Sequence, residues 1–172
     1  MRRWCTAWRA TSPCTARDLR GAGEHYAQAV ASRPGDSMPH LLQSELLAWR
    51  GEGQRARAAC GTALHLVPPV ALRYWYDAGA ALACWVDGAL EEAVAAAEQS
   101  LRANGRYVPA HCMLAAAQFD NGDAPAARET LDRLLVMHPR FTLDAFLHRT
   151  PARPAVAARL AHALRGAQAS KA

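Results

Sequence analysis

The sequence predicts an all-α protein built from repeated helical hairpins. Hydrophobic residues make up 51% of the 172 residues and charged residues 20%, a composition typical of a folded chain. Alanine dominates and β-branched residues are sparse, which favours helix. A third observation is an internal repeat of turn residues and small residues, which also predicts the order of the helices.

Three sets of landmark residues recur with one series of spacings, 34, 37 and 34. Chance is a poor explanation for three independent sets that keep one register. The turn landmarks are Arg17, Gly51, Gly88 and Gly122; the small-residue landmarks are Ala22, Ala56, Ala93 and Ala127; the end landmarks are Pro34, Pro68, Gly105 and Pro139.

Each landmark has a physical role in a hairpin of two helices. Glycine adopts the tight turn between helices that a Cβ atom would strain. The alanine five residues later lies where the second helix crosses the first, and axes about 8–10 Å apart need a small side chain there. Proline ends the second helix because it lacks the N–H group that continues the hydrogen-bond ladder. We therefore expect Ala56 and Ala127 to be buried, and Ala95, at no landmark, to tolerate a larger side chain.

The register and the breaker residues predict eight helices. Near the C-terminus, Thr150 is a candidate cap, and Pro151 or Pro154 suits the first turn of the last helix. In that helix Val156, Leu160, Ala163 and Leu164 form an apolar face, opposite Arg159, His162 and Arg165. The predicted ranges are 17–33, 37–50, 53–66, 71–86, 89–104, 109–121, 124–138 and 153–166.

The repeat resembles the tetratricopeptide repeat family, whose pattern combines a bulky residue, Leu-Gly/Ala, a turn glycine, two alanines and a closing proline. The clearest unit is the third, with Leu114-Ala115, Gly122, Ala127, Leu131, Leu134 and Pro139. The resemblance implies a right-handed superhelix of about three full repeats, a preceding half repeat and a C-terminal capping helix. Its segments are an irregular N-terminus at 1–15, a half repeat at 16–34, repeats at 37–68, 72–105 and 108–139, a capping segment at 141–167 and a tail at 168–172.

Three features depart from the family pattern. Gln43-Ser44 stand where Leu-Gly/Ala is usual, and Gly105 stands where proline is usual. The middle unit also carries three extra residues, either near "VPPVALRYW" or between its two helices. The residues leave both frames open.

No motif in the sequence indicates catalysis, and we expect no catalytic, cofactor-binding or metal-binding residues. A phosphate-binding GxxxxGK[ST] loop and an HExxH zinc motif are both absent, and no nucleophile elbow surrounds a serine. The five cysteines form no CxxC pair and their number is odd, which favours free thiols in a reducing, cytoplasmic setting. The apolar runs are too short for a membrane span.

The candidate functional surface is a concave groove, because in the family the first helix of each repeat lines one. Transferring those positions gives an apolar and aromatic set without the Lys/Asn/Arg group that clamps a carboxylate in some relatives. Trp49 and Phe119 are expected to be partly exposed there, as binding hot spots. The candidate groove residues are Leu41, Glu45, Trp49, Trp75, Leu82, Trp85, Cys112, Ala116 and Phe119, and the packing residues are Ala22, Ala56, Ala93, Ala127, Gly51, Gly88 and Gly122.

These features predict a non-enzymatic interaction module that binds an apolar or amphipathic protein segment. An alternative is a regulatory fragment, because "HPRFTLDAFLHR" followed by "ALRGAQ" resembles the end of repeat arrays in bacterial adenylate/guanylate cyclases and winged-helix transcriptional regulators. A second alternative is weak nucleic-acid binding. The net charge of +5 arises from five basic residues after Asp144, but they are more dispersed than a nucleic-acid footprint. Partner identity and oligomeric state are left open.

Overall fold

The computed structural model describes residues 19–67 and 72–170, and these ranges contain helices and no strand. The prediction of an all-α fold is confirmed for this part of the chain. None of its helices is long and apolar enough to cross a membrane. The irregular N-terminus predicted at 1–15, with Cys5 and Cys14, lies outside the described residues, as do Pro68 and Lys171. The helices are α2 (Leu19–Ser32), α3 (Ser37–Trp49), α4 (Gly53–Leu66), α5 (Arg73–Asp87), α6 (Leu90–Ala103), α7 (Val108–Asp120), α8 (Ala124–Met137), α9 (Leu143–Arg149) and α10 (Pro154–Ala169).

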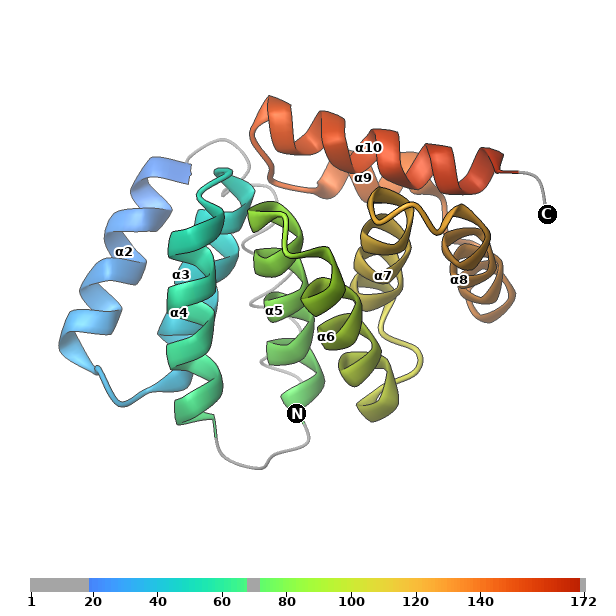
Figure 1. The fold of residues 1–172 in the computed structure, drawn as a ribbon. Helices are drawn as coiled ribbons and strands as arrows, with labels where there is room; N and C mark the ends of the chain where they lie inside the picture. Colours follow the sequence, from blue (N-terminus) through green and yellow to red (C-terminus); the bar gives the residue numbers. More distant parts are fainter. Residues whose placement is uncertain (1–18, 68–71, 171–172) are drawn as a thin grey trace.

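Three helical hairpins, α3–α4, α5–α6 and α7–α8, form the body of the molecule, with α2 packed against α3 (Figure 1). The eight predicted helices are all present, with ends within three residues of the predicted ones. Helices α2, α4, α6 and α8 end at residues 32, 66, 103 and 137, each two residues before an end landmark. The spacing of 34, 37 and 34 is therefore a property of the structure as well as of the sequence.

The turn inside each hairpin has the same hydrogen bonds. Gly51, Gly88 and Gly122 have φ of 82°, 86° and 88°, a left-handed conformation that favours glycine. In each turn the N–H of the glycine donates to the carbonyl of the residue three positions before it. The N–H of the residue that follows the glycine donates to a carbonyl five positions before that residue, and all six N···O distances are 2.8–3.2 Å. This is the Schellman arrangement, which satisfies carbonyls at the end of the first helix.

The small residues after each turn lie where the two helices of a hairpin cross. Ala56, Ala93 and Ala127 are all 0% exposed, so the predicted burial of Ala56 and Ala127 is confirmed, and Ala95 is exposed. Ala22 is half-buried. Ser44, one of the departures from the family pattern, is also 0% exposed, and its hydroxyl donates to the Ala56 carbonyl at 2.8 Å. A small polar side chain thus links α3 to α4 at this crossing.

The first helix of each hairpin is more deeply buried than the second. We call α3, α5 and α7 the inner helices, because each packs against its hairpin partner and against the neighbouring inner helix. Residues 110–117 of α7 are all buried, so this helix has no wholly exposed face along that stretch. Helices α4, α6 and α8, the outer helices, bury a single stripe; in α4 it consists of Gly53, Ala56, Cys60 and Ala63. This one-sided pattern is typical of a surface helix.

The helix bounds decide where the extra residues of the middle hairpin lie. The turn around Gly88 has the same hydrogen bonds as the other two, so nothing is inserted between α5 and α6. The segment 67–72 before α5 has six residues, whereas 33–36 and 104–107 have four each. Helix α5 starts one residue further from its turn glycine than α3 and α7 do. The first of the two frames, with the extra residues near "VPPVALRYW", is therefore the observed one.

The C-terminal segment folds differently from the single helix predicted for it. Helix α9 was not predicted, although Thr142 caps it by accepting a hydrogen bond from the Ala145 N–H at 3.3 Å. Phe141 and Phe146 flank this cap with ring centroids 6.0 Å apart, the arrangement of a hydrophobic staple. Thr150, predicted as a cap of the last helix, instead ends α9, and its hydroxyl donates to the Phe146 carbonyl.

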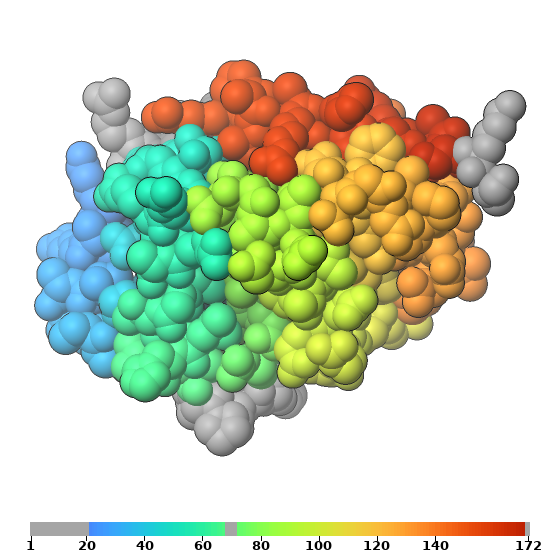
Figure 2. All heavy atoms as spheres, in the orientation of Figure 1, coloured from blue at the N-terminus to red at the C-terminus, as the bar shows by residue number. Residues whose placement is uncertain are grey.

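Helix α10 runs across one edge of the molecule, over the C-terminal ends of the inner helices (Figures 1 and 2). Pro154 occupies its first turn, as predicted. The predicted apolar face is buried: Leu160, Ala163 and Leu164 are 0% exposed and Val156 is 9% exposed. The helix makes most of its contacts with α7 and α8, and the Arg153 N–H donates to the Trp49 carbonyl of α3 at 2.9 Å. Helix α10 thus connects the first hairpin to the last.

Candidate functional site

The predicted groove residues fall into two groups in the structure. Five of them are core residues with at most 4% exposure, so they offer no surface to a partner: Leu41, Leu82, Trp85, Cys112 and Ala116. Four are half-buried: Glu45, Trp49, Trp75 and Phe119. The predicted partial exposure of Trp49 and Phe119 is confirmed, whereas the prediction of an open groove along all nine positions is not supported by these burial values.

One end of the predicted groove is covered by α10, around the indole of Trp85. The Arg159 guanidinium carbon lies 4.3 Å from the centroid of the Trp85 ring, which is cation–π geometry. The Arg159 Nε atom donates to Asp120 Oδ2 at 2.9 Å, and the Trp85 Nε1 atom donates to the same oxygen at 2.9 Å. Three residues from three helices therefore form one polar contact, and Asp120 is 14% exposed within it. Arg159, predicted on the polar face of the last helix, keeps 39% of its side chain exposed and has a specific partner that the prediction did not include.

Phe119 contacts the same helix through its ring. The imidazole of His162 meets the Phe119 ring edge-on, with centroids 5.9 Å apart. A Cβ atom added to Gly166 would lie 2.3–2.9 Å from three atoms of that ring, so only glycine allows this approach. His162, expected to face solvent, is exposed but has this aromatic neighbour. Phe119 therefore joins α7 to α10, and replacing it changes the packing of the fold.

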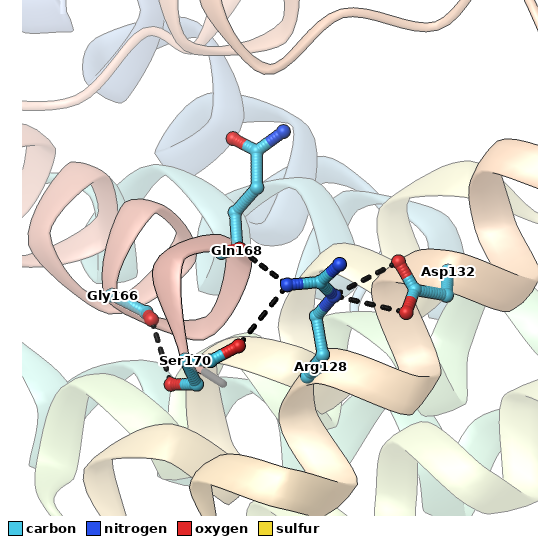
Figure 3. A network of polar contacts seen from close by, with 5 residues as sticks. All are labelled: Arg128, Asp132, Gly166, Gln168 and Ser170. Carbon is cyan, nitrogen blue, oxygen red and sulfur yellow. Dashed lines mark hydrogen bonds and ion pairs between the residues drawn. The ribbon is translucent and has the colours of Figure 1, made fainter. Parts of the chain in front are cut away.

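The far end of α10 is held by Arg128 of α8 (Figure 3). Its Nη1 atom donates to the Gln168 carbonyl at 2.8 Å and to the Ser170 carbonyl at 3.1 Å. Its Nε atom donates to both oxygens of Asp132, at 2.9 and 3.0 Å. A cation at the C-terminal end of a helix satisfies carbonyls that have no partner within the helix. Figure 3 also shows the Ser170 hydroxyl, which donates to the Gly166 carbonyl at 2.9 Å.

The other end of the predicted groove centres on Glu45 and Trp75, which the structure brings together. The Trp75 Nε1 atom of α5 donates to Glu45 Oε1 of α3 at 3.0 Å. Gly79, one turn further along α5, is in tight contact with α3, because an added Cβ would lie 2.6 Å from Leu41 Cδ1 and 3.9 Å from Glu45 Oε1. This close approach places the carboxyl group against α5, and both Glu45 and Trp75 remain half-buried.

Burial changes the proton affinity of the groups around Glu45. It raises the pKa of the Glu45 carboxyl from its ordinary 4.5 to about 7, and the hydrogen bond from Trp75 opposes this rise. Burial also raises the pKa of Tyr26 on α2 and of Tyr107 before α7, and the charge of Glu45 adds to both effects. A raised pKa caused by burial, next to aromatic side chains, is a feature found at many functional sites.

The cysteines lack the properties of a nucleophile. Burial raises the pKa of Cys60 to about 12, and burial also raises the pKa of Cys84 and of Cys112. The thiolate is the reactive form, so these thiols remain protonated and inert at neutral pH. All three are free. Within the described ranges, no group of three or more His, Cys, Asp or Glu residues could hold a metal ion.

Surface depressions occur away from the predicted groove. One of about 360 Å³ lies between α8, α9 and α10 and is lined by Leu131, Leu135, Phe141, Thr142, Leu143, Asp144, Arg165 and Gln168. A second of about 290 Å³ lies between α2, α3 and α4, around Gly23, Gln43 and Leu46. Neither includes a predicted groove residue, and neither carries a constellation of catalytic side chains.

Comparison with known proteins leaves the site to be interpreted from its own geometry. A scan against protein-family models gives no match, and a search of curated proteins gives none either.

Two features of the site were missed by sequence reasoning. The first is the contact of Arg159 with Trp85 and Asp120, which depends on α10 crossing the inner helices and leaves no local signal. The second is the set of close glycine contacts at Gly53, Gly79 and Gly166, where an added Cβ would lie 2.3–2.6 Å from the nearest atom. A glycine inside a predicted helix is itself a signal of close packing, because elsewhere it lowers helix stability.

Proposed function

We propose that this protein is a non-enzymatic interaction module of the tetratricopeptide repeat type, which binds a protein segment on the surface around Glu45 and Trp75. The observation that carries the proposal is the half-buried, hydrogen-bonded pair itself. Trp75 and Glu45 come from two neighbouring inner helices, on positions that line the groove in the family that the repeat resembles. Large aromatic side chains at such positions are the ones most often found as binding hot spots.

The repeat architecture supports the proposal. Three hairpins with one turn geometry and buried alanine crossings are what helix–turn–helix units of that kind would have. Arrays of this kind present binding surfaces on their inner helices and carry function without catalytic groups. The partner class that suits a surface with Trp49, Trp75 and Glu45 is an amphipathic segment with apolar anchors.

The alternative of nucleic-acid binding by the basic C-terminus is less favoured. Arg159 and Arg165 each pair with a carboxylate, Asp120 and Asp144, at 2.9 and 3.0 Å. Paired arginines contribute less to a phosphate-binding surface than free ones. A salt-dependent gel shift with duplex DNA and single-stranded RNA tests this alternative, and tight binding that weakens steeply with salt would favour it over the groove.

The interaction hypothesis is tested by capture of partners from a cell extract with the full chain as bait. Trp75→Ala and Trp49→Ala should each reduce the recovery of a specific partner by tenfold or more, since hot-spot aromatics contribute about 2 kcal/mol or more. Val136→Ala is the matched control, because Val136 is 80% exposed on an outer helix. Circular dichroism should show unchanged helicity in all three variants. Equal recovery by all three would refute a binding role for these aromatic residues.

A further inference from the structure

The sheltered carboxylates of this protein differ in one respect, which is whether an arginine neutralises them. The side chains of Asp77, Asp120 and Asp87 are 6%, 14% and 19% exposed. Their partners are Arg73, Arg159 and Arg57, at 3.0, 2.9 and 3.1 Å. A charge removed from water is stable only when it is paired, so this pattern is the expected one.

Glu45 is the exception among the sheltered carboxylates. In the described part of the chain no Arg, Lys or His pairs with its carboxylate, and its one side-chain hydrogen bond comes from the neutral indole of Trp75. Its Oε2 atom accepts from no described donor. The charge of Glu45 raises the pKa of Tyr26 of α2, Cys60 of α4 and Tyr107 before α7, and none of these groups is a cation.

The surroundings of Glu45 are those of a site for a positive charge. Trp75, Tyr26 and Tyr107 are all half-buried, and the faces of aromatic rings attract cations. Tyr74 packs edge-on against Tyr107, with ring centroids 4.9 Å apart, which extends the aromatic surface between α5 and α7. The fold itself gives a precedent, because at the other end of the inner helices Arg159 contacts a tryptophan ring and an aspartate at once.

We propose that the Glu45–Trp75 site binds a basic side chain, the ammonium of a lysine or the guanidinium of an arginine, from a protein partner. The carboxylate pairs with the cation and the neighbouring aromatic rings cover its alkyl stem. This inference names the chemistry of the partner and so depends on the proposed interaction function. It also explains why an acidic residue occupies this place, because burial alone favours a neutral side chain there, as the raised pKa of Glu45 indicates.

The test is a titration of the full chain with N-acetyl-lysine amide and N-acetyl-arginine amide, followed by the indole N–H resonance of Trp75 in NMR spectra. Trp75→Phe assigns the resonance. At about pH 8 each cation should give a saturable shift with a dissociation constant on the order of millimolar, as for a single charged contact. The neutral control, N-acetyl-norleucine amide, should bind at least tenfold more weakly.

Glu45→Gln keeps the size of the side chain and the acceptor for Trp75, and it should weaken cation binding at least tenfold. Lowering the pH of the wild type below about 6 should have the same effect, because the carboxyl group is then protonated. Any one of three results would overturn the proposal. These are the absence of a saturable shift, binding of norleucine amide as tight as that of the cations, and cation binding to Glu45→Gln as tight as to the wild type. Because the probes are small molecules, the outcome of this titration does not depend on the capture of a partner. If the cations bind but no protein partner is captured, the cation site stands and only the proposal that its ligand belongs to a protein is refuted.

Discussion

Replacing Glu45 with glutamine should stabilise the protein at alkaline pH and leave its stability at acidic pH unchanged. Burial raises the pKa of this carboxyl group from 4.5 to about 7 in the folded state. Between these two values the folded chain binds a proton that the unfolded chain releases, so its free energy of unfolding falls as the pH rises. Above about pH 8 the full destabilisation is present, and below about pH 4 there is none, because both states are protonated.

The magnitude follows from the same two pKa values. A difference of one pK unit corresponds to about 1.4 kcal/mol, so the step from 4.5 to about 7 corresponds to about 3 kcal/mol. Glu45 keeps part of its surface in water, and solvent screens its charge to that extent. We therefore expect Glu45→Gln to raise the free energy of unfolding by about 1–3 kcal/mol at pH 8. Glutamine retains an oxygen that accepts the hydrogen bond from Trp75.

The assay is urea denaturation followed by far-UV circular dichroism, at several pH values between acid and alkali. The difference between Glu45→Gln and wild type should grow with pH and level off above about 8. Glu24→Gln on α2 is the matched control, because Glu24 is exposed and it should change stability little at any pH. A destabilised Glu45→Gln at alkaline pH, or a difference that does not vary with pH, would refute the reasoning.

Four other predictions concern the packing. Ala56→Leu and Ala127→Leu should each lower the free energy of unfolding by about 1–3 kcal/mol in thermal melts, whereas Ala95→Leu should have little effect. Equal melting temperatures for all three variants would contradict the assigned helix crossings. Gly166→Ala should loosen α10 and increase hydrogen exchange there, whereas Gly61→Ala, whose Cβ meets nothing within 4 Å on α4, should stabilise the protein by about 0.5–1 kcal/mol. Arg159→Gln should lower the free energy of unfolding by about 1–3 kcal/mol because it leaves the sheltered charge of Asp120 without a cation, whereas Arg165→Gln, at a pair whose aspartate is 85% exposed, should change it by less than about 1 kcal/mol. Burial lowers the pKa of His111, so stability should fall as the pH drops from 6.5 through the folded value, and His111→Gln should flatten that part of the curve.

The sequence predicted the helices well because their boundaries depend on local chemistry. A glycine that must adopt positive φ ends the first helix of each hairpin, and this requirement holds wherever the hairpin lies in space. Asp36 and Asp123 cap α3 and α8 by accepting hydrogen bonds from N–H groups two and three residues ahead. The buried alanines also follow from spacing, because their distance from the turn sets the face of the helix that they occupy.

The candidate site could be predicted only in part because it depends on contacts between distant segments. The positions of Trp85 and Cys112 on inner helices were correct, but periodicity cannot separate a groove residue from a core residue when the helix is buried on several sides. The path of α10 decides which aromatics are covered, and its 16 residues would have the same amphipathic pattern in another position. The seven-residue α9 was missed because so short a helix shows barely two turns of any pattern.

The two ends of the predicted groove therefore differ in whether their sheltered carboxylate is paired with an arginine. At the C-terminal ends of the inner helices the protein supplies its own cation, because Arg159 pairs with Asp120 and lies over the Trp85 ring, next to the buried face of α10. Ten residues earlier on α5 the same kind of pair, the Trp75 N–H bonded to the Glu45 carboxylate, lacks an arginine among the described residues. On the proposed function, the second pair is where a group of the partner gains most, because it can neutralise a charge that the fold leaves unpaired. Tyr26→Arg places a cation on α2, where the charge of Glu45 already raises the pKa of Tyr26, and it should weaken cation binding at Glu45 in the same NMR titration while leaving the Trp85 indole resonance unchanged.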